Sequence, residues 1–279
     1  MRKFPRSTMV WLFLIGISLA LMLVGYRFGG RLGLFVGFLF TVLLHCLIFF
    51  FGNSQLLSYL EAHLFEGQDP WGLQNILQRQ ALLLQISKPR LYISESPGAF
   101  AFSLGQSWQK SAVCLSIGLL NRLTPEEIEA VIAHQICHIY RLSNFRFGVA
   151  HSLAFSTLGL GKILDQLFSP VAKIQNKIQR PFTTVLSPLA WLILKFSVTE
   201  KVYFQNDEMA GQLLKDRRFL AEALWKLEGL CTSYPMTLPL CNNHFFIVNP
   251  LGLKEKNWFL LAHPKVDVRI KKLIGYFPL

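Results

Sequence analysis

The sequence predicts a mostly helical α+β domain that follows a transmembrane helical hairpin, and three observations support this fold class. Two uncharged apolar runs of roughly twenty residues open the chain, and each is long enough to cross a bilayer as a helix. Short β-rich runs bounded by turn residues follow between residues 90 and 120. A helix with well-specified ends then carries two histidines four residues apart, on one face.

The apolar N-terminal region is predicted to be a membrane domain over residues 1–52, with spans at about 8–26 and 32–51. A small-x-small cleavage site is missing, which favours an uncleaved hairpin over a signal peptide. Basic residues before the first span place the N-terminus and the following domain on the cytoplasmic side of the inner membrane. Two arginines in the turn, Arg27 and Arg31, argue against this orientation.

Composition also points to a membrane protein. The 279 residues are 52% hydrophobic and carry a net charge of +12. The lysines and arginines are scattered beside apolar runs, without the aromatic-interleaved basic stripe of a nucleic-acid binder, so the expected partner is a lipid bilayer. The five cysteines lack the spacing of a disulfide framework, which indicates reduced thiols.

Residues 53–279 are predicted to form the folded domain. Trp71 to Ile86 has the apolar stripe of a helix, and Arg90 to Ser94 and Phe100 to Leu104 are expected to form a strand pair around the turn Ser-Pro-Gly. Val113 to Leu120 has the composition of a strand or a helix. A sheet followed by a helix that bears two histidines is a zincin-like order of elements.

The helix that begins after Thr124 carries the candidate chemistry. Thr124 and Glu127 form a predicted capping box at its start. His134 and His138 lie one above the other, as in the zinc motif H-E-x-x-H, in which the glutamate activates a metal-bound water. Here Gln135 stands in place of that glutamate, and a carboxamide has no useful basicity.

Two further apolar segments, 147–168 and 181–196, interrupt the domain. Each is short for a span, so two alternatives remain open: a second membrane hairpin, or a structure lying partly in the interface. In the second alternative, a basic edge of Lys173, Lys177 and Arg180 would face lipid head groups.

Glu200 to Lys215 is predicted to be an amphipathic helix, and with it the chain resembles the HtpX-like family of membrane zinc metalloproteases, related to the CAAX-prenyl endopeptidases. The resemblance covers most of the chain and rests on motifs in the family's order. The matches are Gly98, Ala99, Phe100 and Ala101 for N-A-F-A; Gly118 to Leu120 with Leu123 and Glu127 before His134 to His138; Tyr203 to Ala210 for E-x-x-A-D-x-x-A; and His263-Pro264 with Arg269, Ile270 and Leu273 for the late motif.

The resemblance implies a gluzincin-type fold, a zinc ion and a substrate groove beside Gly98 to Ala101. It also implies metal ligands at His134, His138 and the position of Tyr203, and a general base at the position of Gln135. Asp207 would orient a histidine, and His263 and Arg269 match late-motif residues. A phenol is a poor zinc ligand at neutral pH, because it loses its proton only near pH 10. Glu200, one helix turn earlier, is the possible substitute.

These departures predict a pseudoprotease: an HtpX-like homologue with weak or absent zinc that keeps a groove for unfolded or membrane-protein segments. In this hypothesis a segment adds as a strand beside residues 99–102. One alternative is an active zinc endopeptidase that acts on membrane proteins. The other is a structural subunit of a membrane complex with an empty metal site.

Overall fold

The computed structural model describes residues 7–51, 54–105, 107, 109–168, 181–236, 238, 240–252 and 263–275. The chain divides into two compact units, Met1–Gln55 and Leu56–Leu279. The predicted basic edge of Lys173, Lys177 and Arg180 lies outside the described residues. Among the described residues, three helical segments are long and apolar enough to cross a membrane: Ile15–Leu44, Ser143–Gln166 and Pro181–Leu213.

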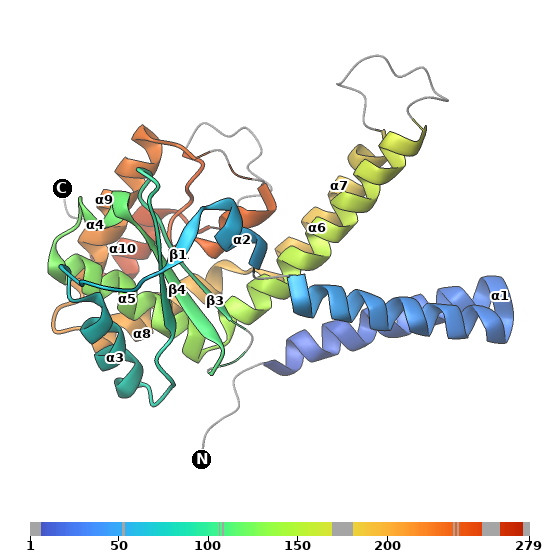
Figure 1. Cartoon of the computed structure of the whole chain (residues 1–279), viewed down its shortest axis with the longest axis horizontal. Helices are drawn as coiled ribbons and strands as arrows, with labels where there is room; N and C mark the ends of the chain where they lie inside the picture. Colours follow the sequence, from blue (N-terminus) through green and yellow to red (C-terminus); the bar gives the residue numbers. More distant parts are fainter. Residues whose placement is uncertain are drawn as a thin grey trace. The chain divides into compact units, whose positions relative to one another are not determined.

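The first unit is a helical hairpin, as the sequence predicts (Figure 1). Helix α1 runs over Ser7–Phe51, but Gly30 has a non-helical conformation with φ 55° and ψ −136°, which reverses the chain. Only glycine adopts such dihedral angles without strain. The two arms touch at glycine: a Cβ on Gly33 would lie 1.9 Å from the carbonyl oxygen of Gly25. The arms therefore pack backbone against backbone, as small residues allow between membrane helices.

Replacing Gly33 with leucine is therefore expected to separate the two arms, at a cost of about 1–3 kcal/mol or more, since a side chain would overpack a backbone contact. The measurement is the SDS fraction at which the purified protein loses helicity, which should fall. Gly16→Leu is the matched control, because a Cβ at Gly16 meets nothing within 4 Å. Equal midpoints for the two variants would contradict this packing.

The second unit contains a four-stranded sheet in the order β1-β2-β4-β3. The strands are β1 (Ala62–Leu64), β2 (Arg90–Ser94), β3 (Ala101–Gly105) and β4 (Ser111–Ser116). β2 and β4 are parallel, while β1 and β3 are antiparallel to their neighbours.

This topology corrects the predicted strand pair. β2 and β3 do not pair with each other, because β4 lies between them and pairs with both. The run Val113 to Leu120 is strand at first and helix afterwards, since Ser116 ends β4 and its side chain accepts the amide hydrogen of Leu119 to begin α4 (Ile117–Leu120). β1 was not predicted.

Helix α5 (Pro125–Tyr140) is the centre of this unit and packs against α3 (Leu73–Leu83), α8 (Glu200–Leu213), α9 (Arg218–Ser233) and β3. The predicted capping box of Thr124 and Glu127 is present at its start. The remaining elements of the unit are α2 (Ser54–Tyr59), the 3-10 helix η1 (Leu240–Phe245) and α10 (Val266–Ile274).

Two hydrophobic clusters lie on opposite faces of the sheet, because successive strand residues point to alternate sides. Val113 and Leu115 face the cluster formed with α3, α5, α9 and α10. Phe102 and Cys114 face the second cluster, which includes residues of α6, α7, α8 and η1. The candidate site lies between α5 and this second cluster.

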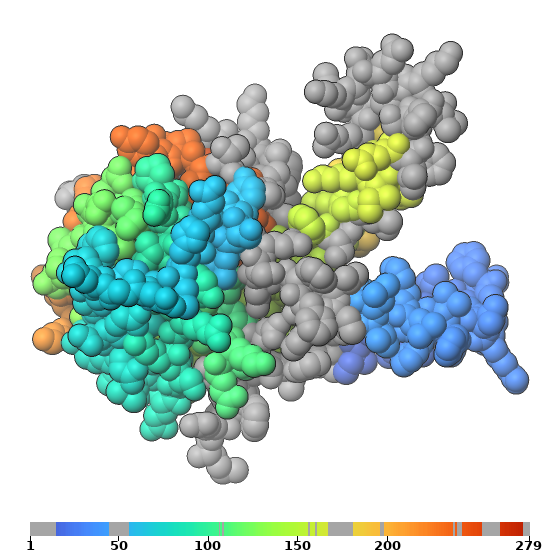
Figure 2. Space-filling model, viewed as in Figure 1, coloured from blue at the N-terminus to red at the C-terminus, as the bar shows by residue number. Residues whose placement is uncertain are grey.

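Helices α6 (Ser143–Phe168) and α7 (Pro181–Ser197) run side by side and project from the body of the unit (Figure 1; α6 is yellow in Figure 2). Asp165 joins them, because its carboxylate accepts the amide hydrogens of Phe182 and Thr183 at 2.9 and 3.0 Å. The first half of α6 is buried in the body, while the projecting part exposes large apolar side chains: Phe155, Ile163, Val185, Leu189 and Leu192. This exposure fits a membrane environment.

Candidate functional site

The two histidines of α5 form the centre of the candidate site. Their ring centroids lie 4.8 Å apart, and both side chains are buried, His134 completely. Burial lowers the pKa of each imidazole, because a charged ring would lose its hydration. Both rings are therefore neutral at pH 7 and have the protonation state in which histidine binds metals.

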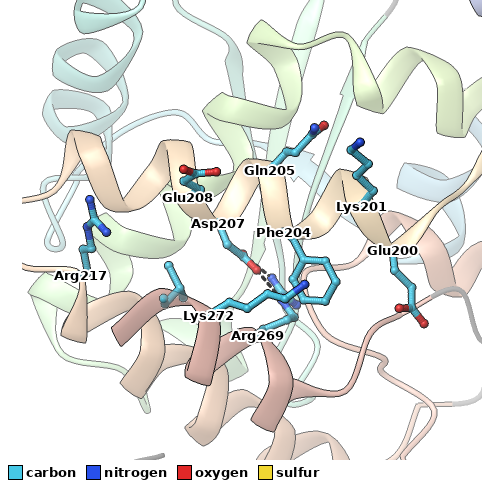
Figure 3. Close-up of a pocket in the computed structure, with 10 residues that line it drawn as sticks. Glu200, Lys201, Phe204, Gln205, Asp207, Glu208, Arg217, Arg269 and Lys272 are labelled. Atoms are coloured by element: carbon cyan, nitrogen blue, oxygen red, sulfur yellow. Dashed lines mark hydrogen bonds and ion pairs between the residues drawn. The ribbon is translucent and has the colours of Figure 1, made fainter. Parts of the chain in front are cut away.

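His134 faces a buried ion pair rather than an open space. Its Nε2 lies 3.1 Å from Asp207 Oδ1 and 3.3 Å from Arg269 Nη2. Arg269, which is completely buried, donates two hydrogen bonds to Asp207, from Nε at 2.8 Å and from Nη2 at 2.7 Å (Figure 3). A bidentate guanidinium–carboxylate pair compensates both charges where water is excluded.

His138 is held by a different set of polar groups. Its Nδ1 lies 3.1 Å from the hydroxyl of Ser143, which also accepts a hydrogen bond from Asn206 at 3.2 Å. Sequence reasoning missed Asn206, although it lies one helix turn after Tyr203 and therefore on the same face of α8. The group beside His138 is therefore a neutral hydroxyl.

Gln135 and Tyr203 both donate to backbone carbonyls. The amide of Gln135 lies 3.4 Å from the carbonyl oxygen of Ala101, and the hydroxyl of Tyr203 donates to that of His244 at 2.7 Å. Both side chains are buried. The residue at which the resemblance implies a general base is thus a non-basic amide, and the residue at which it implies a third ligand is a neutral phenol that is already hydrogen-bonded.

The predicted groove beside Gly98 to Ala101 is not open to an added strand. The amide of Ile247 donates to the carbonyl oxygen of Ala101 at 3.1 Å, and Phe102 forms an antiparallel bridge with Phe246. At the start of the groove, Met236 fills the space beside Gly98, where a Cβ would lie 3.2 Å from its Cγ. The chain's own C-terminal half therefore covers this edge of the sheet.

Glu200 is not brought to the histidines. Its side chain is exposed at the start of α8, and Figure 3 shows it directed away from Asp207 and Arg269. It lines a cavity of about 680 Å³ together with Phe204, Lys272 and the buried ion pair. Lys272 lies over the ring of Phe204, with Nζ 3.4 Å from the centroid. In this arrangement Glu200 lines a cavity and does not face the two histidines.

The donor set is too small for a catalytic zinc site, which needs three protein ligands and an open position. In the part of the chain that the structure describes, no group of three or more histidine, cysteine, aspartate or glutamate residues is placed to hold a metal ion. His134 Nδ1 is buried without a hydrogen-bond partner there, while Nε2 of the same ring faces the Asp207–Arg269 ion pair. The Arg269 guanidinium beside His134 opposes a second cation electrostatically. The residues present at the two histidines therefore do not fit a catalytic zinc ion.

Comparison with known proteins shows which family and which relatives this chain resembles. The model of peptidase family M48 matches residues 68–276. A "Protease HtpX homolog" of Pelotomaculum thermopropionicum is 26% identical over 271 residues, which cover 95% of this chain and 96% of the relative. That of Acaryochloris marina is 29% identical over 271 residues, covering 94% and 89%. The crystal structure of S. mikatae Ste24p is 18% identical with a TM-score of 0.48; the match covers 96% of this chain and only 64% of that one.

Proposed function

Since the chain belongs to peptidase family M48, we propose that it is an HtpX-like membrane protein that has kept the zincin-like fold and lost peptide hydrolysis. One observation carries the proposal: Gln135 and Tyr203, at the positions of the general base and of the third ligand, both donate to carbonyls of their own chain. Neither side chain is free to activate water or to complete a ligand set.

Magnitudes support a severe loss of activity. A positioned general base contributes about 10²–10⁴ in rate, and Gln135 cannot accept the proton. A site with two imidazoles and no carboxylate should also bind zinc more weakly than a three-ligand site. We therefore propose that the chain binds zinc weakly or not at all. The residual rate would be too low for a useful peptidase.

In place of cleavage, the protein is proposed to bind membrane proteins or their unfolded segments. The exposed apolar side chains of α6 and α7 support this role, because lipid or the helices of another membrane protein would cover them. The proposed location is the inner membrane with the folded unit facing the cytoplasm, from the basic residues that precede the first span.

The test uses the purified full-length chain. We expect no chelator-sensitive cleavage of casein and far less than one zinc per chain by elemental analysis. The variant Gln135→Glu with Tyr203→Glu is the comparison, because it returns both missing carboxylates. Chelator-sensitive cleavage by the wild-type chain would falsify the proposal. Stoichiometric zinc that is lost on His134→Ala would exclude an empty site while leaving the loss of hydrolysis in place.

A further inference from the structure

His244–Val248, the closing segment, covers the edge of the sheet beside β3. Phe246 and Ile247 lie where a fifth strand would add on the outer side of β3, whereas His244 and Phe245 form the end of η1. The Ile247 amide donates to Ala101 at 3.1 Å, and Phe246 forms the antiparallel bridge to Phe102. These are the main-chain contacts that an extended peptide makes when it adds to a sheet edge.

The carbonyls of the closing segment are held by the residues at three family-motif positions. Tyr203 donates to the carbonyl oxygen of His244 at 2.7 Å, and Arg269 Nη1 donates to that of Ile247. His263 Nε2 lies 2.8 Å from the carbonyl oxygen of Phe246, so a proton on that nitrogen completes a third hydrogen bond. The three donors come from α8, from the residues before α10 and from α10 itself. The closing segment is thus bound on both sides, by β3 and by these three side chains.

Side-chain packing fixes the closing segment in the same place. The ring of Phe246 lies edge-on to Phe100 and Phe102, with centroids 5.5 and 5.4 Å away. Phe245 packs against His151 at 5.5 Å. All five residues of the segment are at most 6% exposed. Moving the segment away from the sheet would expose several large apolar side chains to water, which costs free energy. The segment is therefore held more firmly than a mobile lid.

We propose that the closing segment is an internal ligand of the former peptide cleft, and that Tyr203, His263 and Arg269 serve as a clamp on its carbonyls. The clamp closes the β3 edge to peptides from outside. Tyr203 thus has a positioning role here, which explains why a phenol suits a position where a metal ligand would be needed in a protease. This inference concerns the closing segment alone and holds whether or not the histidines bind zinc.

Hydrogen exchange of the full-length chain in detergent, followed by mass spectrometry, tests the clamp. In the wild type, peptides that cover 244–248 should be protected as strongly as those of β4. Tyr203→Phe removes only the clamping hydroxyl and should speed exchange in these peptides about tenfold, the effect of one lost buried hydrogen bond, while β4 is unchanged. Tyr92→Phe is the matched control, since it removes a hydroxyl from β2, which β4 separates from β3.

Three results would overturn the proposal. The first is a closing segment that exchanges as fast as an unstructured peptide in the wild type. The second is a segment that exchanges as slowly in Tyr203→Phe as in the wild type. The third is faster exchange of the segment when a synthetic peptide with the sequence of residues 243–248 is added, because that would show a displaceable lid. None of these results depends on cleavage or metal content, so this inference and the proposed loss of hydrolysis fail separately.

Discussion

Replacing Asp207 with alanine is expected to destabilise the unit of residues 56–279 by about 3–5 kcal/mol, because it leaves the buried Arg269 guanidinium without its counter-charge. His134 also loses the carboxylate at its Nε2. The measurement is guanidinium-induced unfolding of the purified chain in detergent. Arg79→Ala is the control: it breaks the ion pair with Glu129, in which Arg79 is 56% exposed, and should cost no more than about 1 kcal/mol.

A second variant also removes the charge of Arg269, which Asp207→Ala leaves without a counter-charge. Asp207→Ala combined with Arg269→Met should regain part of the lost stability, since the double variant has no uncompensated buried charge. A single Asp207→Ala variant that unfolds within about 1 kcal/mol of the wild type would show that the ion pair does not stabilise this unit.

Acid is expected to destabilise the same unit from about pH 6.5 downward. Burial lowers the pKa of His244 from 6.5 to about 3, so the unfolded chain binds a proton that the folded chain rejects. Its stabilising contribution is complete above pH 6.5 and is lost as the pH falls toward 3. At pH 5 the loss from His244 alone is about 2 kcal/mol. The lowered pKa values of His134 and His138 act in the same direction.

The measurement compares the free energy of unfolding at pH 7.5 and pH 5.0. His244→Gln is the informative variant, because an amide can still donate to the Phe147 carbonyl, which lies 3.2 Å from His244 Nε2, but takes up no proton. Its loss of stability between the two pH values should be smaller than that of the wild type by about 2 kcal/mol. An unchanged difference would mean that His244 is solvated or protonated in the folded protein.

Local features were predictable because their physics acts over a few residues. The capping box of Thr124 and Glu127 needs only a spacing of three, and the membrane hairpin needs two apolar runs and a turn. The spacing of His134 and His138 likewise places both on one face of α5. The departures at Gln135 and Tyr203 were visible as residue types. Their hydrogen-bond partners were not, because those lie 34 and 41 residues away.

The sequence by itself determined the membrane hairpin, the capped helix with its two histidines, and the residue types that stand where a base and a ligand are expected. Only the tertiary structure decided that β4 separates β2 from β3, that Arg269 reaches Asp207 across 62 residues, and that residues 244–248 cover the sheet edge. The physical reason is range. Caps, turns and periodicity act between near neighbours, whereas strand order and buried ion pairs depend on which distant segments exclude water together.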